Sequence, residues 1–344
     1  MATKQRPQAN QKKALILPKS LKPGSTIAIC TPASPITVPD SWIQDSYSFL
    51  RGKGYSVIEG RNVRSVYGHT AGEIKQRVKS LHELFTDPSV SAIMAFWGGL
   101  QSHQLLEYLD FDLIREHPKI FVGYSDITAL NAALYSQAKL VSFSGPAGIS
   151  FCSRNRFPYT WDHFERLVSK RAAEFVIKPS PMWADDTWWR YKDRGFRKRR
   201  SAGWKVFRPG TAAGPLIGGN LGTLLLLHGT KYWPNLDGAL LLVEEDATEK
   251  PGSINRLFTR LRHLGIFDQI SGLVIGRFCG DVGFSSKDSL EMILKDALKG
   301  YNFPVVYDVD FGHTAPMFTF PIGIRGEISS RPLQLRITQP CVTD

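Results

Sequence analysis

Residues 119–137 read KIFVGYSDITALNAALYSQ, which joins an apolar run, a tight turn and a second apolar stretch. The run at 119–123 predicts a buried strand, and the stretch at 126–137 predicts a helix. A strand that leads directly into a helix is typical of βαβ units, so the segment predicts an α/β fold. The turn between the two elements carries Ser125, which is therefore expected at the end of a strand.

The same alternation continues on both sides of this segment. Because strands interleaved with helices indicate a mostly parallel sheet, ligands are expected at the carboxyl ends of the strands. The further predicted strands are 26–31, 55–59, 91–96, 239–243, 271–278, 304–308 and 333–337, and the further predicted helices are 40–52, 71–85, 101–109, 254–264 and 286–298.

The alternation breaks between about residues 155 and 210, where Pro, Trp and Arg are frequent. Such a stretch is typical of a connector with a long exposed loop. We therefore divide the chain into a disordered basic tail (1–14), an N-terminal domain carrying the candidate nucleophile (15–165), a connector (166–210) and a C-terminal domain (211–344).

Composition narrows the function classes. No apolar run approaches the roughly 18 residues of a membrane span, and the polar N-terminus has no apolar core of a signal peptide, so no membrane association is expected. The four cysteines are isolated and no Cys/His spacing fits zinc, which predicts free thiols, a cytoplasmic location, no metal and no cofactor. The net charge of +12 suits an anionic partner.

Ser125 is the candidate nucleophile. A serine on a tight strand-to-helix turn is exposed at the sheet edge, and the helix N-terminus behind it offers N–H groups to an oxyanion. The alternative is that Ser125 only caps the helix, a role that serine fills well. The turn Gly98-Gly99 is expected at the same edge, where it either supplies an oxyanion donor or is an ordinary turn.

A base and an acid are expected from the second half of the chain. His313 follows the strand-like sequence PVVYDVD, and a histidine on such a loop can reach a serine at a strand end. Three acids, Glu244-Glu245-Asp246, follow another predicted strand. One of them could orient the histidine and stabilise its imidazolium, or the three could form a solvated turn.

Five segments together resemble the LD-carboxypeptidase family of serine peptidases. The resemblance covers about residues 20–340, and the motifs keep the order and spacing of the family. The segments are AFWGGLQSHQLLEYLDFD, PKIFVGYSDITALNAALY, LLVEEDATEKPGSINRLFTRL, FGHTAPMFTFPIG and PLIGGNLGTL.

The resemblance implies a mechanism and a fold. It assigns Ser125 as nucleophile and His313 as base, with Glu245 as the acid. Glu244 occupies an apolar position of the family motif, which leaves Glu244 as the alternative acid. The backbone N–H groups of Gly99 and Asp126 would form the oxyanion hole. The implied fold is a flavodoxin-like N-terminal domain and a smaller C-terminal α/β domain, with the active site between them, in a homodimer.

The segment 183–208 combines aromatic and basic side chains, which suit a substrate carrying a nucleotide base and a phosphate-like group. Trp183 and Trp189 are the candidate stacking residues, and Asn220 in PLIGGNLGTL is a further substrate-binding candidate. The alternatives are that the tryptophans only pack the connector onto the body, and that the basic run at 197–200 is a solvated or nucleic-acid-binding patch.

The family has two main branches, and this chain looks closer to the one that resembles the microcin C self-immunity peptidase. That branch cleaves an amide between a peptide or amino acid and a nucleotide-like group. We therefore expect a small-molecule peptidyl or aminoacyl conjugate as substrate. Cleavage of murein tetrapeptides is the alternative activity. The alternative from another class is a catalytically silent nucleic-acid-binding protein, although nucleic acid is not the expected partner.

Overall fold

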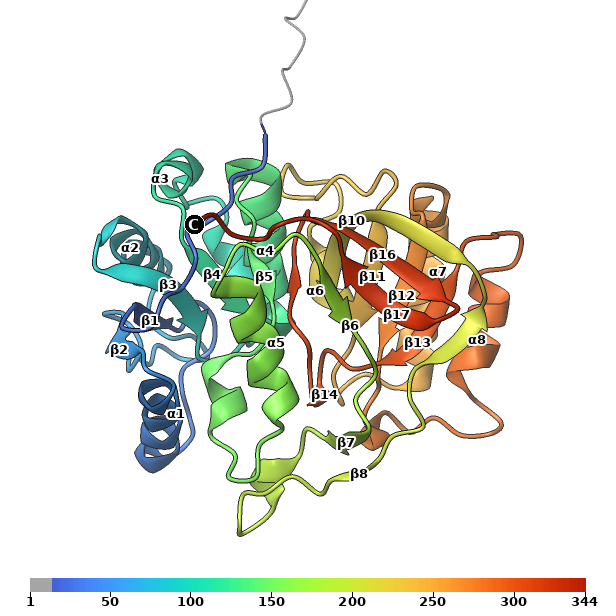
Figure 1. The fold of residues 1–344 in the computed structure, drawn as a ribbon, viewed down its shortest axis with the longest axis horizontal. Coiled ribbons are helices and arrows are strands. Elements are labelled where there is room, and N and C mark those ends of the chain that lie inside the picture. Colours follow the sequence, from blue (N-terminus) through green and yellow to red (C-terminus); the bar gives the residue numbers. More distant parts are fainter. Residues whose placement is uncertain (1–13) are drawn as a thin grey trace, which may run out of the picture.

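The computed structural model describes residues 14–344, so the predicted tail lies outside the described residues except for residue 14. Two α/β domains lie side by side in Figure 1, with the N-terminal domain in blue to green and the C-terminal domain in yellow to red. One continuous cluster of buried apolar side chains extends through both domains. No helix among the described residues is long and apolar enough to cross a membrane.

The N-terminal sheet has five parallel strands in the order β2-β1-β3-β4-β5, which is the order of flavodoxin-like folds. This confirms the expected fold class. The strands are β1 (Thr26–Cys30), β2 (Ser56–Glu59), β3 (Val90–Ala95), β4 (Ile120–Gly123) and β5 (Phe143–Ser144). The helices of this domain are α1 (Asp40–Gly52), α2 (Ile74–Thr86), α3 (Phe111–Glu116), α4 (Thr128–Ala133) and α5 (Pro158–Val168).

The C-terminal sheet has eight strands in the order β6-β17-β16-β10-β11-β12-β13-β9, with a parallel centre from β10 to β13. Its strands are β6 (Phe175–Ile177), β9 (Lys205–Arg208), β10 (Thr211–Asn220), β11 (Leu240–Glu244), β12 (Gly272–Gly276), β13 (Val305–Val309), β16 (Arg325–Ser330) and β17 (Leu333–Ile337). The helices are α6 (Leu221–Leu226), α7 (Pro251–His263) and α8 (Leu290–Ala297). β11 and β12 are buried along their whole length, as expected for central parallel strands.

The connector is more ordered than the exposed loop that its composition predicts. Its β6 and β9 form the two edges of the C-terminal sheet, and β7 (Met182–Asp185) lies between β8 (Arg199–Arg200) and β14 (Thr314–Ala315) in a small third sheet. The side chains of Trp188, Phe196 and Trp204 are buried. The prediction missed this because β6, β7 and β9 also pair with strands near the end of the chain, and only the pair of β7 and β8 is local.

The chain also crosses back between the domains. β15 (Phe320–Pro321), which follows the loop carrying His313, pairs antiparallel with β5 at the edge of the N-terminal sheet. The loop that carries His313 is therefore held between the two domains, next to the carboxyl end of β4.

Two helices differ from their predicted form. The helix expected at 126–137 consists of a 3-10 turn at Ser125–Ile127, the α-helix α4 and a π-helical turn at Leu134–Ala138. The helix expected at 101–109 is only a 3-10 turn at Ser102–Leu105. Both deviations begin at the sheet edge, where the chain bends around the site described next.

Candidate active site

Ser125 lies directly after β4, in a backbone conformation that serine rarely adopts. Its φ is +63°, in the left-handed region that costs a non-glycine residue about 1–2 kcal/mol. Its side chain does not cap the helix that follows. The Oγ atom instead lies 3.1 Å from Nε2 of His313. The turn therefore presents the hydroxyl to an imidazole, which argues against a role limited to helix capping.

His313 reaches Ser125 from the loop after β13. Its second ring nitrogen, Nδ1, lies 2.6 Å from Oε2 of Glu244, the last residue of β11. Three side chains from three different strand ends thus form one hydrogen-bonded row. This is the arrangement of a serine, a base and an orienting acid.

The structure corrects the expectation that Glu245 contacts His313, because Glu244 makes that contact. Successive side chains along a strand point to opposite faces of the sheet. Of two adjacent glutamates at the end of β11, only one can therefore face the histidine. Glu245 faces away, where its carboxylate accepts hydrogen bonds from the Asn220 side chain (2.8 Å) and the backbone of Gly222.

Glycines make room for the carboxylate of Glu244. A Cβ atom on Gly312 would lie 2.5 Å from Oε2 of Glu244, and one on Gly276 would lie 2.8 Å from its Cβ atom. Gly312 also has a φ of +92°, which other residues rarely adopt. The motif Phe-Gly-His at 311–313 therefore needs its glycine so that the histidine loop can close over the glutamate.

The two glycines after β3 lie against the serine turn. A Cβ atom on Gly98 would lie 3.0 Å from the Cβ and 3.1 Å from the Oγ of Ser125, and 3.1 Å from the backbone nitrogen of Asp126. One on Gly99, whose φ is +145°, would lie 2.2 Å from Oγ of Ser34. A side chain at Gly98 would therefore collide with the serine turn, and the glycine lets the two turns pack together. The signal for Gly98 was present in the sequence as the glycine pair.

Asp126 is held in place by Ser102. The Asp126 carboxylate accepts a hydrogen bond from the Ser102 backbone (2.8 Å), and the Ser102 hydroxyl donates to the Asp126 carbonyl (2.6 Å). Both residues are buried. These contacts fix the side chain and the carbonyl of Asp126, the residue next to Ser125.

A pocket of about 580 Å³ opens over the serine. Ser125, His313 and Gly99 all line it, so the reacting groups are accessible from one cavity. The other lining residues are Ser34, Pro35, Thr37, Gly68, His69, Trp97, Gly98, Tyr124 and Ile149.

The charges around the imidazole change its acidity. Burial alone lowers the pKa of His313, but the carboxylate of Glu244 and its hydrogen bond outweigh burial and raise this pKa to about 9. Burial and the charge of Glu244 also raise the pKa of Glu245 to about 7. A histidine stabilised as imidazolium is suited to hold the proton that it takes from a serine.

The three predicted substrate-binding residues lie in different surroundings. Asn220 is buried and does not line this pocket, since its Oδ1 caps α6 through Thr223 and its Nδ2 holds Glu245. The ring of Trp183 carries the guanidinium groups of Arg199 and Arg277 at 4.0 and 4.8 Å from its centroid. Trp189 is 47% exposed and lines two further pockets.

Trp189 is therefore the candidate that a ligand can reach, whereas Trp183 packs against the protein's own cations. The sequence could not separate them because both lie in the same aromatic and basic segment. The basic run at 197–200 is partly paired in the same way, since Arg197 forms an ion pair with Asp193 and Arg199 forms one with Asp185.

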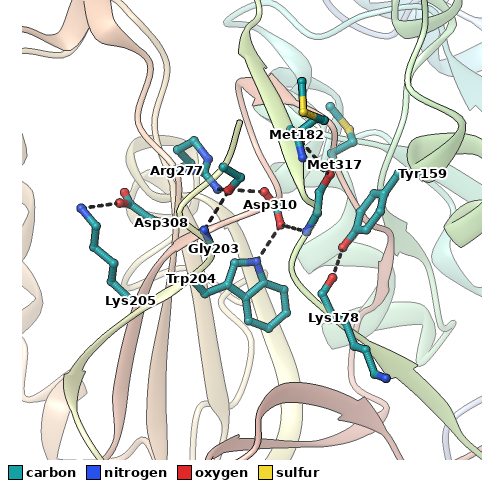
Figure 2. A network of polar contacts seen from close by, with 12 residues as sticks. Tyr159, Lys178, Met182, Gly203, Trp204, Lys205, Arg277, Asp308, Asp310 and Met317 are labelled. Carbon is teal, nitrogen blue, oxygen red and sulfur yellow. Dashed lines mark hydrogen bonds and ion pairs between the residues drawn. The ribbon is translucent and has the colours of Figure 1, made fainter. Parts of the chain in front are cut away.

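A buried network fastens the connector beside the histidine loop (Figure 2). Asp310, three residues before His313, accepts hydrogen bonds from the Trp204 ring (2.7 Å), the Ser180 backbone (2.8 Å) and the Arg277 guanidinium (2.9 Å). Removing one partner of such a buried ion pair leaves an uncompensated charge. Asp310 therefore acts as a structural anchor for the loop that carries the histidine.

Both domains match domains of one family of known proteins. Residues 27–145 match the LD-carboxypeptidase N-terminal domain, and residues 213–328 match the LD-carboxypeptidase C-terminal domain. The putative carboxypeptidase YocD of Bacillus subtilis is 36% identical over 305 residues, covering 88% of this chain and 93% of that protein.

Two further similar proteins are MccF itself and an MccF-like protein. The microcin C7 self-immunity protein MccF of Escherichia coli is 30% identical over 331 residues, covering 94% of this chain and 96% of that protein. Its structure in complex with aspartyl sulfamoyl adenosine superposes with a TM-score of 0.88 and covers 95% of this chain and 100% of that one.

An MccF-like protein from Bacillus anthracis superposes equally well, with a TM-score of 0.88 at 35% identity, covering 94% of this chain and 99% of that one. Both domains of the family are thus present in their order, with a serine at the strand end where the two meet. The chain is a serine hydrolase of the LD-carboxypeptidase family.

Proposed function

We propose that this enzyme hydrolyses the amide bond between an amino acid or peptide and a nucleotide-like group, with Ser125, His313 and Glu244 as its catalytic triad. The observation that carries the proposal is the hydrogen-bonded row of these three side chains, with separations of 3.1 and 2.6 Å. The row opens into a pocket that is large enough for a small molecule.

In the first half of the reaction, Nε2 of His313 takes the proton of the Ser125 hydroxyl as the oxygen attacks the substrate carbonyl. Glu244 accepts the hydrogen bond from Nδ1–H and stabilises the imidazolium. The carbonyl oxygen becomes an oxyanion, which the backbone N–H groups of Gly99 and Asp126 stabilise.

In the second half, the tetrahedral intermediate collapses and the C–N bond breaks. His313 gives its proton to the leaving nitrogen, so the nucleotide-like product departs with an N–H group. A water molecule then attacks the acyl-serine with His313 as base. The acid product is released and Ser125 regains its proton.

The proposed leaving group fits the aromatic surroundings of the site. A second cavity of about 500 Å³ shares Thr37, Trp97 and Ile149 with the pocket over Ser125. Its other lining residues are Val38, Pro39, Trp42, Trp188 and Trp189. Aromatic faces bind nucleobases by stacking. We therefore place the base of the substrate against Trp189, consistent with the nucleotide-like ligand of the MccF complex.

A comparison of two substrates tests this proposal against cleavage of murein tetrapeptides, the alternative activity in this family. Wild-type enzyme and the Ser125→Ala variant are incubated separately with aspartyl sulfamoyl adenosine and with a murein tetrapeptide, and the products are quantified by mass spectrometry. We expect the wild-type enzyme to release sulfamoyl adenosine faster than it releases D-alanine, and the variant to release neither. Faster release of D-alanine would favour the murein activity instead.

Two further expectations belong to the proposal. The resemblance to this family suggests a homodimer, which sedimentation analysis of the purified chain would test. The free, buried state of Cys30, Cys152, Cys279 and Cys341 suits a reducing compartment such as the cytoplasm.

A further inference from the structure

Asp186 is an acid of the connector that the catalytic row does not use. It follows β7, whose pairing with β14 joins Asp185 to Thr314 and Ala184 to Ala315. Continued by one residue beyond the paired strands, this register sets Asp186 opposite His313, and both residues line one cavity. Directly opposed residues of antiparallel strands have Cβ atoms about 4.5–5.5 Å apart. The small third sheet therefore brings an acid of the connector beside the catalytic histidine.

This carboxylate faces cavities. Asp186 lines one cavity together with His313 and Trp189, and another, of about 320 Å³, together with Tyr124, Ser150 and Thr314. Within residues 14–344, its carboxylate forms no hydrogen bond or ion pair with another side chain or backbone group. A half-buried acid without a partner, placed between two cavities, is available to a ligand.

Asp186 cannot be a second orienting acid for the imidazole. Both ring nitrogens of His313 are already in use, one by Glu244 and the other by Ser125. A carboxylate beside a fully bonded imidazole has no ring N–H left to accept. Its available partner is a group that arrives with the substrate.

The charges around His313 favour a cationic group of the substrate. Three carboxylates, Glu244, Asp186 and Asp246, act on this one imidazole. Arg190 lines the cavity that Asp186 shares with His313, but its guanidinium is already held in an ion pair with Asp281 at 2.7 Å. Burial is the main reason that the pKa of Asp186 is raised to about 7, and a positive charge from a ligand would restore its ionised form.

We propose that the Asp186 carboxylate binds the free α-ammonium group of an aminoacyl substrate and so determines which acyl groups this enzyme accepts. The α-ammonium group is attached to the carbon next to the carbonyl that Ser125 attacks, so it must lie close to the triad. The acyl side chain then points into the cavity of about 320 Å³ that Asp186 lines. This inference rests on the proposed function and specifies the acyl half of its substrate.

The test compares aspartyl sulfamoyl adenosine with its N-acetylated form at pH 7, where an α-amino group is mostly protonated. The wild-type enzyme is compared with Asp186→Asn and with Asp193→Asn, a matched change at an exposed acid of the same connector. The quantity measured is kcat/KM for release of sulfamoyl adenosine from each substrate.

We expect the wild-type enzyme to prefer the free amine by about 10- to 100-fold, the range expected for a charged hydrogen bond. Asp186→Asn should bring the ratio of the two kcat/KM values close to one, and Asp193→Asn should leave the ratio unchanged. The ratio is measured within one enzyme, so a general loss of activity or stability does not move it.

Equal wild-type activity on both substrates would overturn the inference while leaving the proposed function intact. An equal loss on both substrates in Asp186→Asn would overturn it as well, because the acid would then act on the catalytic groups. Binding of the two ligands to the Ser125→Ala variant supplies a second readout, and we expect the free amine to bind more tightly. A wild-type enzyme that cleaves neither substrate would instead refute the proposed function, and this inference with it.

Discussion

Exchanging the carboxylate of Glu244 for an amide should nearly abolish catalysis. In the structure, Oε2 of this residue lies 2.6 Å from Nδ1 of His313, and only 3% of its side chain is exposed. Glu244→Gln keeps the shape but removes the charge that stabilises the imidazolium, and the amide can donate to Nδ1 and favour the wrong tautomer. The equivalent change in a serine protease triad costs on the order of 10⁴-fold in kcat. This corresponds to about 5.5 kcal/mol of transition-state stabilisation.

The matched control is Glu245→Gln, which changes the adjacent residue in the same way. Glu245 is also buried but contacts Asn220 and Gly222, so we expect its loss of kcat to stay below about 10-fold. The assay is initial-rate release of sulfamoyl adenosine, with thermal denaturation to confirm that both variants fold. A large loss in Glu245→Gln together with near wild-type turnover in Glu244→Gln would refute this assignment.

Three further predictions concern the surroundings of the triad. Because His313 must be neutral to accept a proton and its pKa is raised to about 9, kcat/KM for the N-acetylated substrate, which has no amine to titrate, should rise with pH up to about 9, and a plateau already at pH 7 would contradict this. Gly98→Ala should lower kcat by about 10²-fold, the loss typical of a displaced oxyanion donor, because the added Cβ would lie 3.0 Å from the Cβ of Ser125 and 3.1 Å from the backbone nitrogen of Asp126 and would push the serine turn out of place. Unchanged kcat in rate measurements would contradict it. Trp189→Ala should weaken binding of adenosine monophosphate by about 5- to 150-fold in calorimetric titrations, whereas Trp183→Ala should not, and equal effects would refute the stacking site.

The two-domain α/β fold could be predicted because its signals are local. Apolar strands such as 119–123 and the helices after them are visible as short periodic runs, and the carboxyl ends of parallel strands gather at one edge. Their places at strand ends made Ser125 and His313 candidates, and the resemblance to the family paired them although 188 residues separate them. The structure brings them within hydrogen-bonding distance.

The choice between adjacent glutamates could not be made in the same way. Which of Glu244 and Glu245 faces the histidine depends on the face of β11 that each side chain occupies, and three successive acids carry no periodic signal. Asp186 could not be found at all, because its position opposite His313 comes from the pairing of two short strands more than 100 residues apart. The tryptophans were recognised as a group, but Trp183 is covered by Arg199 and Arg277, and composition does not reveal these contacts.

Covalent labelling of the serine tests the central claim most directly. The wild-type enzyme is treated with a fluorophosphonate, which reacts with activated serine hydroxyls, and the adduct is located by peptide mass spectrometry. We expect a single adduct on Ser125 that is lost in Ser125→Ala and strongly slowed in His313→Ala. Absence of labelling, labelling at a different residue, or equally fast labelling without the imidazole would contradict the account.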